Sequence, residues 1–379
     1  MASTLREAPA VDVSDGPRVV SLEASVYRVP TDRPEADGTA HWTATTMVLV
    51  ELQASDGSRG LGYTYGSAAA AQLIHELLTD EVMNRPVDKV RAAWEAMIRA
   101  VRNVGRPGIA ATAISAVDIA LWDLKAKTYG RPLAQVLGQR RREVPVYGSG
   151  GFTSYSIAEL QSQLADWAEQ GFPRVKMKIG KDWGNRAEED IERVAAARAA
   201  IGPTVELFVD ANGAYTTKQA IALADRMQGL DVSYFEEPVS SDHLEQLARV
   251  RRRASMAIAA GEYAYDPWYV RDMLEAGAVD VQQADVTRCL GITGWLAAAD
   301  VAYAFDVPFS GHCAPSVHAA AACAVPAIAH LEFFHDHARL EEMFFDGFLH
   351  PVDGFLRPNP TRPGLGLDLK RRDAERYRH

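Results

Sequence analysis

Residues 174–180 have the sequence RVKMKIG, an apolar run that carries two lysines and ends in a glycine. In a β-strand, residues two apart point to the same face, so Lys176 and Lys178 would share one face. Two ammonium groups side by side on a buried face would each need a negatively charged partner. Taken alone, the pair could equally be the solvated end of a strand, because lysine is mostly an exposed residue. The sequence downstream favours the buried alternative.

Five short apolar runs follow this stretch, and each one ends at a polar residue. These polar residues are Asp210, Glu236, Glu262, Asp285 and His312. Their successive separations are 26, 26, 23 and 27 residues, and helix-like stretches lie between the runs. A strand followed by a helix at this period is a βα repeat. Polar residues at the carboxyl ends of successive strands are where a (β/α)8 barrel places its catalytic groups.

The βα repeat predicts a barrel over residues 145–340. Its strands are predicted near 145–149, 174–179, 206–210, 233–236, 257–260, 279–284, 307–310 and 329–334. Beyond residue 340 the periodicity is lost, and four prolines between 351 and 363 indicate extended, looped structure.

The first 144 residues lack the βα period and are organised differently. Strand-like stretches lie at 18–28 and 46–54, and a return strand follows within 57–62. The segment 30–43, rich in Pro, Gly, Asp and Ala, is predicted to be a loop. Apolar periodicity predicts helices at 70–78, 86–102, 109–129 and 132–137, and residues 1–16 are predicted to be a loose tail.

The composition limits both the class of protein and its partners. The 379 residues are 47% hydrophobic and 24% charged, which is typical of a soluble globular protein with a sizeable core. A net charge of -10 and a pI ≈ 5.5 argue against a nucleic-acid partner and against an anionic membrane. An odd count of three cysteines, no signal-peptide pattern and no long apolar run predict a cytoplasmic protein.

Six motifs occur in one order along the chain: Lys176-Met177-Lys178, Asp210-Ala211-Asn212, Glu236-Glu237-Pro238, Gly261-Glu262, Asp285 and Gly311-His312. In this order and approximate spacing they resemble the enolase superfamily, in the mandelate racemase subgroup with its muconate lactonizing enzyme-like members. The resemblance covers the chain from about residue 17.

The resemblance implies an α/β fold with three parts. The catalytic part would be a modified (β/α)8 TIM barrel, of the (β/α)7β form, at 145–340. An N-terminal α+β capping domain would occupy 1–144, and a C-terminal segment at 341–379 would return to that domain. A homo-oligomer, either a dimer or an octamer, is expected.

Three acids at the ends of successive strands form a candidate metal site. Asp210, Glu236 and Glu262 offer hard oxygen ligands, and three buried carboxylates repel one another unless a cation joins them. Mg²⁺ suits such ligands and keeps positions open for water and substrate oxygens. The alternative is three unrelated strand-end acids, each paired with a base, and Glu237 competes with Glu236 for the ligand role. We predict one Mg²⁺ bound by the three acids.

A Mg²⁺ on a substrate carboxylate stabilises the charge that develops when the α-proton is removed. The base must be neutral, and we expect burial and the neighbouring Lys176 to lower the pKa of Lys178. A hydrogen bond from one ring nitrogen of His312 to Asp285 would fix the tautomer of His312 and raise its basicity. Glu332 could donate a hydrogen bond to the substrate if burial near other acids raised its pKa. For His312 and Asp285, a structural histidine and a strand-end cap are the alternatives.

These groups allow more than one reaction on a small-molecule carboxylate. Two bases on opposite faces of one carbon would racemise or epimerise it, whereas a base and an acid would remove a β-hydroxyl as water. Cycloisomerisation of a sugar lactone would pass through the same enolate. We predict an acid-sugar dehydratase, with a racemase, epimerase or lactone cycloisomerase as alternatives. A non-catalytic metal-binding or assembly protein is the alternative from another class.

By the same resemblance, the capping domain would cover the barrel mouth and select the substrate. The candidate substrate contacts are His41, Trp42 and Tyr63 from that domain and Asn212 from the barrel. The segment 30–43 holds a single cation, Arg33, so a substrate with a strongly dianionic distal end is less favoured.

Two other features suggest chemistry but favour structural roles. Cys313 beside His312 could be a nucleophile, although a small buried cysteine is the favoured interpretation. His335 and His337 lie past the last predicted strand with a spacing that fits no closed metal site, and we predict structural or surface roles for them.

Overall fold

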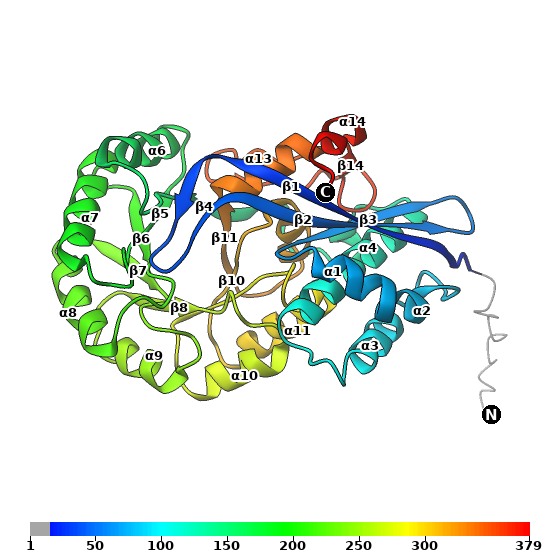
Figure 1. The fold of residues 1–379 in the computed structure, drawn as a ribbon, viewed down its shortest axis with the longest axis horizontal. Coiled ribbons are helices and arrows are strands. Elements are labelled where there is room, and N and C mark those ends of the chain that lie inside the picture. The colour runs from blue at the N-terminus through cyan, green and yellow to red at the C-terminus, as the bar shows by residue number, and fades with distance from the viewer. Residues whose placement is uncertain (1–15) are drawn as a thin grey trace, which may run out of the picture.

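Eight parallel strands form a closed barrel in the computed structural model, which describes residues 16–379 (Figure 1). In chain order they are β4 (Val144–Gly150), β5 (Arg174–Lys178), β6 (Glu206–Asp210), β7 (Val232–Glu236), β8 (Ala257–Ala260), β9 (Val281–Ala284), β10 (Phe309–Gly311) and β11 (Ile328–Phe334). Each strand pairs with the next, and β11 pairs with β4 to close the barrel. All eight predicted strands overlap these elements, and the predicted fold class is confirmed.

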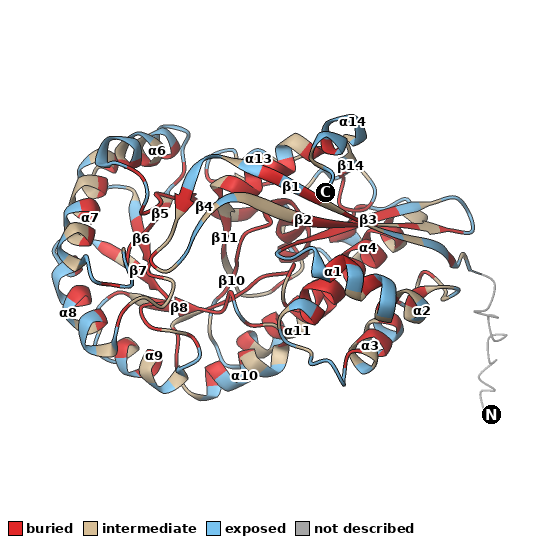
Figure 2. Ribbon diagram, viewed as in Figure 1, coloured by how far each residue is buried: buried red, intermediate tan, exposed pale blue. Residues whose placement is uncertain are grey.

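One helix follows each barrel strand and covers its outer face. They are α6 (Ile157–Glu169), α7 (Ala187–Ile201), α8 (Thr217–Gln228), α9 (Leu244–Arg251), α10 (Pro267–Glu275), α11 (Gly291–Ala304), α12 (Pro315–Ala322) and α13 (His335–Phe344). Local sequence sets several starts: capping boxes begin α6 and α8, and Asp266 caps α10 with a proline in its first turn. Figure 2 shows the strands buried and the outward helix faces exposed.

Strand register places charged side chains at one level of the barrel. Lys178 pairs with Asp210, and Asp210 pairs with Glu236 across adjacent parallel strands. Deeper in the barrel, a cluster of Tyr147, Phe208, Tyr234 and Ala259 fills the interior. The packed layer leaves the carboxyl ends of the strands as the place for a site.

The N-terminal unit is an antiparallel sheet backed by helices. The sheet holds β1 (Val19–Ala36), β2 (His41–Ala54) and β3 (Arg59–Tyr65), in that order. The helices are α1 (Ala69–Leu73), α2 (Thr79–Val82), α3 (Val90–Ala100), α4 (Ile109–Thr128) and α5 (Leu133–Val136), with a π-helical turn (Ile74–Leu78) between α1 and α2. Gly60 and Gly62 of β3 face α4 so closely that a Cβ at either position would overlap the helix backbone.

The predicted loop at 30–43 is wrong: the segment is the end of a long β-hairpin. β1 continues to Ala36, β2 begins at His41, and Asp37 closes the turn by accepting hydrogen bonds from the amides of Thr39 and Ala40 at 2.6 and 2.7 Å. The prolines are tolerated because the ladder is interrupted between Pro30 and Glu35. We call residues 30–43 the arm.

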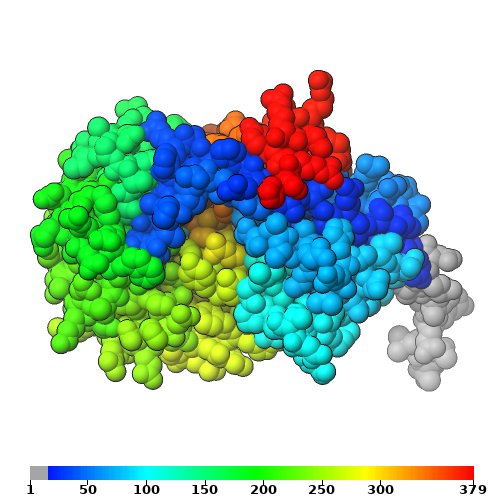
Figure 3. All heavy atoms as spheres, in the orientation of Figure 1, coloured from blue at the N-terminus to red at the C-terminus, as the bar shows by residue number. Residues whose placement is uncertain are grey.

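The arm reaches from the N-terminal sheet to the barrel (Figures 1 and 3). The amide of Thr153 donates to the carbonyl of Ala36 at 2.8 Å, and the amide of Trp183 donates to the carbonyl of Gly38 at 2.9 Å. Gly38 lies against the carbonyls of Ile179 and Ala211, where a Cβ would not fit. The arm is therefore in contact with the loops that follow β4, β5 and β6.

The C-terminal residues contact both the barrel and the N-terminal sheet. β13 (Phe355–Leu356) pairs antiparallel with β4, and β12 (Phe345–Asp346) pairs with β14 (Asp368–Leu369). After α14 (Arg371–Ala374) and a 3-10 turn (Glu375–Tyr377), the amide of His379 donates to Val26 of β1 at 2.9 Å. Of the predicted tail at 1–16, residues 1–15 lie outside the described part of the chain. Among residues 16–379, no helix combines the length and apolar character that crossing a membrane requires.

The close approach of β3 to α4 gives a test of the fold. We expect Gly62→Ala to lower the free energy of unfolding by about 1–3 kcal/mol, because the new methyl group overlaps the backbone of Ala116 and Ala120. Urea denaturation followed by circular dichroism measures this. Gly229→Ala is the matched control, since its φ is -69° and the nearest atom to a Cβ, a carbonyl oxygen, lies 3.9 Å away. Equal losses in the two variants would contradict the packing argument.

Candidate active site

Three carboxylates converge at the ends of β6, β7 and β8. Asp210, Glu236 and Glu262 are all buried, and one ligand oxygen of each lies within 4.8 Å of the others. Glu236 Oε1 is buried and has no hydrogen-bond partner among the described residues. Glu237, which competed for the ligand role in the sequence, is not part of this cluster. A buried, unpartnered carboxylate oxygen among other acids fits a cation ligand.

Lys176 is the fixed counter-charge of the cluster. Its side chain is fully buried, and Nζ lies 2.6 Å from Glu236 Oε2 and 2.8 Å from Glu332 Oε1. Burial lowers the pKa of Lys176, but the negative charges of Glu236 and Glu332 raise it by more. The net pKa therefore lies well above the ordinary value. Gln283 donates to the same Glu236 oxygen at 2.8 Å. Lys176 therefore remains an ammonium group.

Lys178 lies beside the cluster and is held by two groups from β6 and its loop. Its Nζ lies 2.5 Å from Asp210 Oδ2 and 3.1 Å from Asn212 Oδ1. Without a cation, burial lowers the pKa of Lys178, but the charge of Asp210 raises it by more, so the net pKa lies above its usual value. The predicted lowering applies to the site with the cation bound and stays a prediction. A cation bound by Asp210 would draw on the same carboxylate charge and weaken this hold on the proton.

His312 is fixed by acids on both ring nitrogens. Nδ1 lies 2.9 Å from Asp285 Oδ2, and Nε2 lies 3.0 Å from Glu262 Oε2. Asp285 is itself oriented by the amide and hydroxyl of Thr287, both donating at 2.7 Å. The predicted His312–Asp285 pair is thus formed, and the acid on Nδ1 leaves Nε2 directed toward the carboxylate cluster.

Glu332 lies between charged neighbours and neutral hydrogen-bond donors. Burial raises its pKa, but the charge of Lys176, followed by that of His312, lowers it by more, and the net pKa lies below its usual range. The carboxylate accepts hydrogen bonds from Ser149 Oγ at 2.6 Å and from the Cys313 amide at 3.0 Å. Glu332 therefore accepts hydrogen bonds and holds Lys176, while its expected role as a donor to the substrate carboxylate stays a prediction.

A cavity of ≈ 280 Å³ opens beside these groups. Its lining comes from both the N-terminal unit and the barrel: Asp37, Trp42, Ala44, Thr45, Thr46, Gly66, Lys178, Asn212, Glu262, Tyr263, Arg288, His312, Cys313, Phe334 and His337. The volume suits a small molecule, and hydroxyl, amide and charged groups dominate the walls.

The structure brings only two of the four predicted substrate contacts to this cavity. Trp42 and Asn212 line it. His41 is exposed and does not, because alternation along β2 turns it away from Trp42. Tyr63 is fully buried, donates its hydroxyl to Glu341 at 2.7 Å and stacks on Phe345, so it is a structural residue. His41 and Tyr63 are corrected as substrate contacts.

Several cavity residues were missed by the sequence reasoning. Tyr263 directly follows Glu262, and Arg288 lies one turn after Asp285 with Nη1 3.5 Å from Glu262 Oε1. Both residues could have been predicted, because each comes shortly after a motif at the end of a barrel strand. Cys313 is buried with a raised pKa, chiefly from desolvation, which agrees with the favoured non-nucleophilic role.

His337 is buried against the ring of Tyr65 and forms part of the cavity wall. This position matches the predicted structural role, with the addition that the ring reaches the cavity.

The donor set fits Mg²⁺. Asp210, Glu236 and Glu262 would hold it, with no nitrogen or sulfur ligand required and with space on the cavity side. The barrel, this carboxylate cluster, and a lysine and a histidine on one cavity define a metal-dependent enzyme that removes a proton next to a substrate carboxylate.

The chain belongs to the mandelate racemase/muconate lactonizing enzyme family of the enolase superfamily. Residues 22–138 match the mandelate racemase / muconate lactonizing enzyme N-terminal domain, and residues 159–374 match the enolase C-terminal domain-like family. The predicted family and the prediction of an enzyme are confirmed, and the non-catalytic alternative is set aside.

Similar proteins of known name agree with this class. D-galactarolactone cycloisomerase from Agrobacterium fabrum is 32% identical over 378 residues, 95% of this chain and 99% of that protein. A mandelate racemase/muconate lactonizing enzyme-like protein from Rubrobacter xylanophilus has a solved structure that is 53% identical, with a TM-score of 0.92 over 96% of this chain and 100% of that chain.

L-talarate/galactarate dehydratase from Salmonella typhimurium, liganded with Mg and L-lyxarohydroxamate, is 28% identical, with a TM-score of 0.90 over 100% of this chain and 97% of that chain. Mg²⁺ is therefore the cofactor of this enzyme, as predicted.

The metal ligands can be tested by calorimetry. We expect Glu236→Gln to weaken Mg²⁺ binding by roughly tenfold or more, because it removes a charged ligand oxygen from the cluster. Glu206→Gln is the matched control, since Glu206 lies at the exposed, opposite end of β6 and pairs with Arg174. Equal Mg²⁺ affinities in Glu236→Gln and the parent protein would rule out this ligand set.

The arm's role can be tested by a pair of neighbouring substitutions. Trp42→Ala should lower kcat/KM by roughly tenfold on a good substrate, the size expected when a contact worth about 1–2 kcal/mol is lost. His41→Ala should leave the kinetics unchanged, because His41 does not line the cavity. An equal loss of kcat/KM in both variants would indicate that the substitutions disturb the fold of the arm, and would contradict a specific contact between Trp42 and the substrate.

Proposed function

We propose that the protein is an acid-sugar dehydratase that removes water from a polyhydroxy carboxylate. The observation that carries the proposal is the pairing of Lys178 and His312 on one cavity with the carboxylate cluster. The two groups come from β5 and from the end of β10, on different sides of the barrel, and a substrate carbon between them would meet one group on each face.

When bound, Mg²⁺ supplies positive charge for the substrate carboxylate as the α-carbon loses its proton. Lys178, in its neutral form, takes that proton at Nζ. His312, protonated at Nε2, gives a proton to the β-hydroxyl, which leaves as water. Asp285 holds the ring through Nδ1 during this transfer. Lys176 stays charged between Glu236 and Glu332 and adds positive charge beside the metal ligands.

The cavity walls support a substrate with several hydroxyl groups and one carboxylate. Thr45, Thr46 and Tyr263 offer hydroxyl groups, and Asp37 offers an acceptor. Arg33, the single cation of the arm, does not line this cavity and pairs with Glu159 at 3.2 Å. No cation of the arm is therefore available to a second carboxylate, and Arg288, which does line the cavity, is already paired with Glu262 and Asp285. Both observations favour aldonic over aldaric acids.

Lactone cycloisomerisation is the second candidate. It is favoured by the 32% identity to D-galactarolactone cycloisomerase over 95% of this chain. It needs the same α-proton removal but no loss of water. Incubating the protein with a panel of aldonic acids, aldaric acids and sugar lactones separates the two by mass spectrometry, because dehydration lowers the mass of the acid by one water, whereas cycloisomerisation converts a lactone into a product of the same mass.

The roles of the two proton-transfer groups can be tested by solvent deuterium exchange at the α-carbon. With both configurations of a substrate, Lys178→Ala should stop exchange in the configuration whose α-proton faces Lys178, and His312→Asn should stop it in the other configuration, where His312 in its neutral form would act as the base. Each loss should be about 10²–10⁴-fold in rate, the usual contribution of a general base. Proton NMR in deuterium oxide measures the rates.

Lys181→Ala is the matched control, because this lysine pairs with Glu189 at 2.6 Å away from the cavity. Loss of exchange in the same configuration for both Lys178→Ala and His312→Asn would place the two groups on one face and overturn the assignment. The predicted cytoplasmic location and homo-oligomeric state stay predictions from the sequence.

A further inference from the structure

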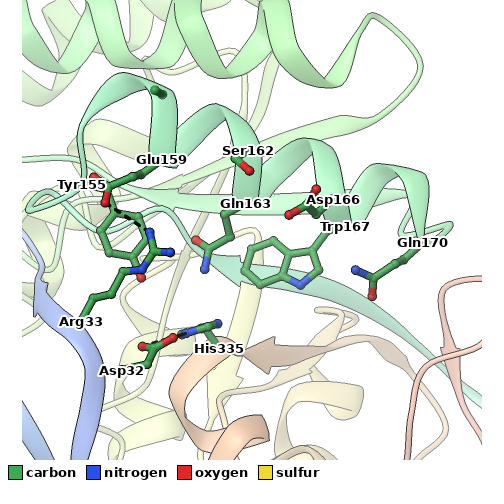
Figure 4. Close-up of a pocket in the computed structure, with 11 residues that line it drawn as sticks. Asp32, Arg33, Tyr155, Glu159, Ser162, Gln163, Asp166, Trp167, Gln170 and His335 are labelled. Carbon is green, nitrogen blue, oxygen red and sulfur yellow. Dashed lines mark hydrogen bonds and ion pairs between the residues drawn. The ribbon is translucent and has the colours of Figure 1, made fainter.

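A larger cavity lies outside the active site, between the arm, α6 and the start of α13. It has a volume of ≈ 480 Å³, and Figure 4 shows its polar lining, which includes Asp32 and Arg33 from the arm, Gln163 and Asp166 from α6, and His335. None of these residues lines the catalytic cavity. The established activity therefore gives this second cavity no role.

An acid–histidine cluster lies at the edge of the larger cavity, which two of its members, Asp32 and His335, line. One ligand atom each of Asp32, Glu35 and His335 lies within 4.8 Å of the others. His335 Nε2 is 3.2 and 3.1 Å from the two carboxylate oxygens of Asp32, and Figure 4 shows the two side chains facing each other. Side-chain exposures of 24% for His335 and 42% for Asp32 leave the cluster accessible to an ion from solvent.

Glu35 gives independent support for a ligand at this cluster, because one of its buried carboxyl oxygens has no partner among the described residues. The residue is only 1% exposed, and its Oε2 accepts a hydrogen bond from Trp42 Nε1 at 2.7 Å. Its other oxygen, Oε1, is buried with no hydrogen-bond partner among residues 16–379. An unpartnered buried carboxylate oxygen is costly, because it has lost water and gained nothing in return.

The charges around the cluster also lack balance. Asp32, Glu35 and Asp336 bring three carboxyl groups together, and Arg339 is the cation nearest to them, donating to Asp336 at 2.5 Å. Arg33, which lines the same cavity, pairs instead with Glu159. Burial, followed by the negative charge of Asp336, raises the pKa of Glu35 to about 8, so the acids repel one another and a cation would be attracted there.

We propose that Asp32, Glu35 and His335 form a second divalent-cation site, separate from the catalytic Mg²⁺ site. One imidazole and two carboxylates suit Zn²⁺ or a similar transition-metal ion better than Mg²⁺, which prefers oxygen ligands alone. With bonds of about 2.0–2.1 Å, two ligand atoms at a tetrahedral angle lie about 3.3 Å apart. The two His335–Asp32 distances are close to that value.

Such an ion ties the arm to the barrel. Asp32 and Glu35 belong to β1, whereas His335 opens α13 directly after the last barrel strand. Through Glu35, the ion also fixes the acceptor that holds Trp42, whose ring packs edge-on against Phe152 and lines the catalytic cavity. The site stabilises the closed position of the wall that selects the substrate.

The first experiment counts bound Zn²⁺ in the full-length protein kept saturated with Mg²⁺. Equilibrium dialysis with elemental analysis should give one Zn²⁺ per chain, with binding at least tenfold weaker in His335→Ala and in Asp32→Asn. His350→Ala is the matched control, since His350 is an exposed histidine 3.6 Å from Glu342 and reports Zn²⁺ binding by a surface pair. Circular dichroism confirms that each variant is folded.

Glu236→Gln separates this site from the catalytic one. The proposal requires that Glu236→Gln still binds the Zn²⁺ that His335→Ala loses. Zn²⁺ binding that disappears in Glu236→Gln and persists in His335→Ala would locate the ion at the catalytic carboxylates and overturn the proposal. Equal Zn²⁺ binding by His335→Ala and His350→Ala would also overturn the proposal, because Asp32 and His335 would then be only a hydrogen-bonded pair.

Hydrogen exchange measured by mass spectrometry tests the link to the arm. Zn²⁺ should slow amide exchange within residues 30–43 of the parent protein and leave it unchanged in His335→Ala. Bound Zn²⁺ without any slowing in the parent would show an ion that does not hold the arm, and the structural role proposed for it would be wrong.

Discussion

Lys176 is the centre of charge on which the rest of the site depends. Its fully buried ammonium group lies between Glu236 and Glu332, at 2.6 and 2.8 Å. Removing two charges from water costs several kcal/mol for each ion, so neither partner could remain there without the other. The charge of Lys176 stabilises several buried carboxylates beside it. The negative charge that Lys176 does not neutralise attracts Mg²⁺. The metal site and the fixed cation are therefore one electrostatic unit.

Much of this unit could be predicted because the barrel repeats locally. Parallel strands in register bring the residue at each carboxyl end to one level, so Lys178, Asp210 and Glu236 become neighbours without any long-range information. The period of the βα repeat was visible from residue types alone. The pairing of His312 with Asp285 follows from the same rule, because their strands are adjacent.

The rest depended on contacts between distant parts of the chain. The arm was mistaken for a loop because its prolines suggested one, whereas pairing between β1 and β2 continues past an interruption in the ladder. The sequence around Tyr63 does not indicate that its hydroxyl donates a hydrogen bond to Glu341, which lies far along the chain. For Glu332, burial near other acids suggested a raised pKa, whereas the charge of Lys176, on a different strand, lowers it. In each case the deciding partner lay on a different element.

The catalytic charges and part of the cavity wall come from different parts of the molecule. The charged cluster is built from strand ends that the barrel holds in register, while Trp42, Thr45 and Thr46 reach the same cavity from the N-terminal sheet. The arm touches the barrel through backbone hydrogen bonds, a glycine that permits close approach, and the pairs Arg33–Glu159 and Asp32–His335, and these contacts do not involve Asp210, Glu236 or Glu262. We therefore expect substitutions in the arm to change the wall of the cavity without disturbing Lys176 and its partners, because a site is made of separable parts carried on one fold.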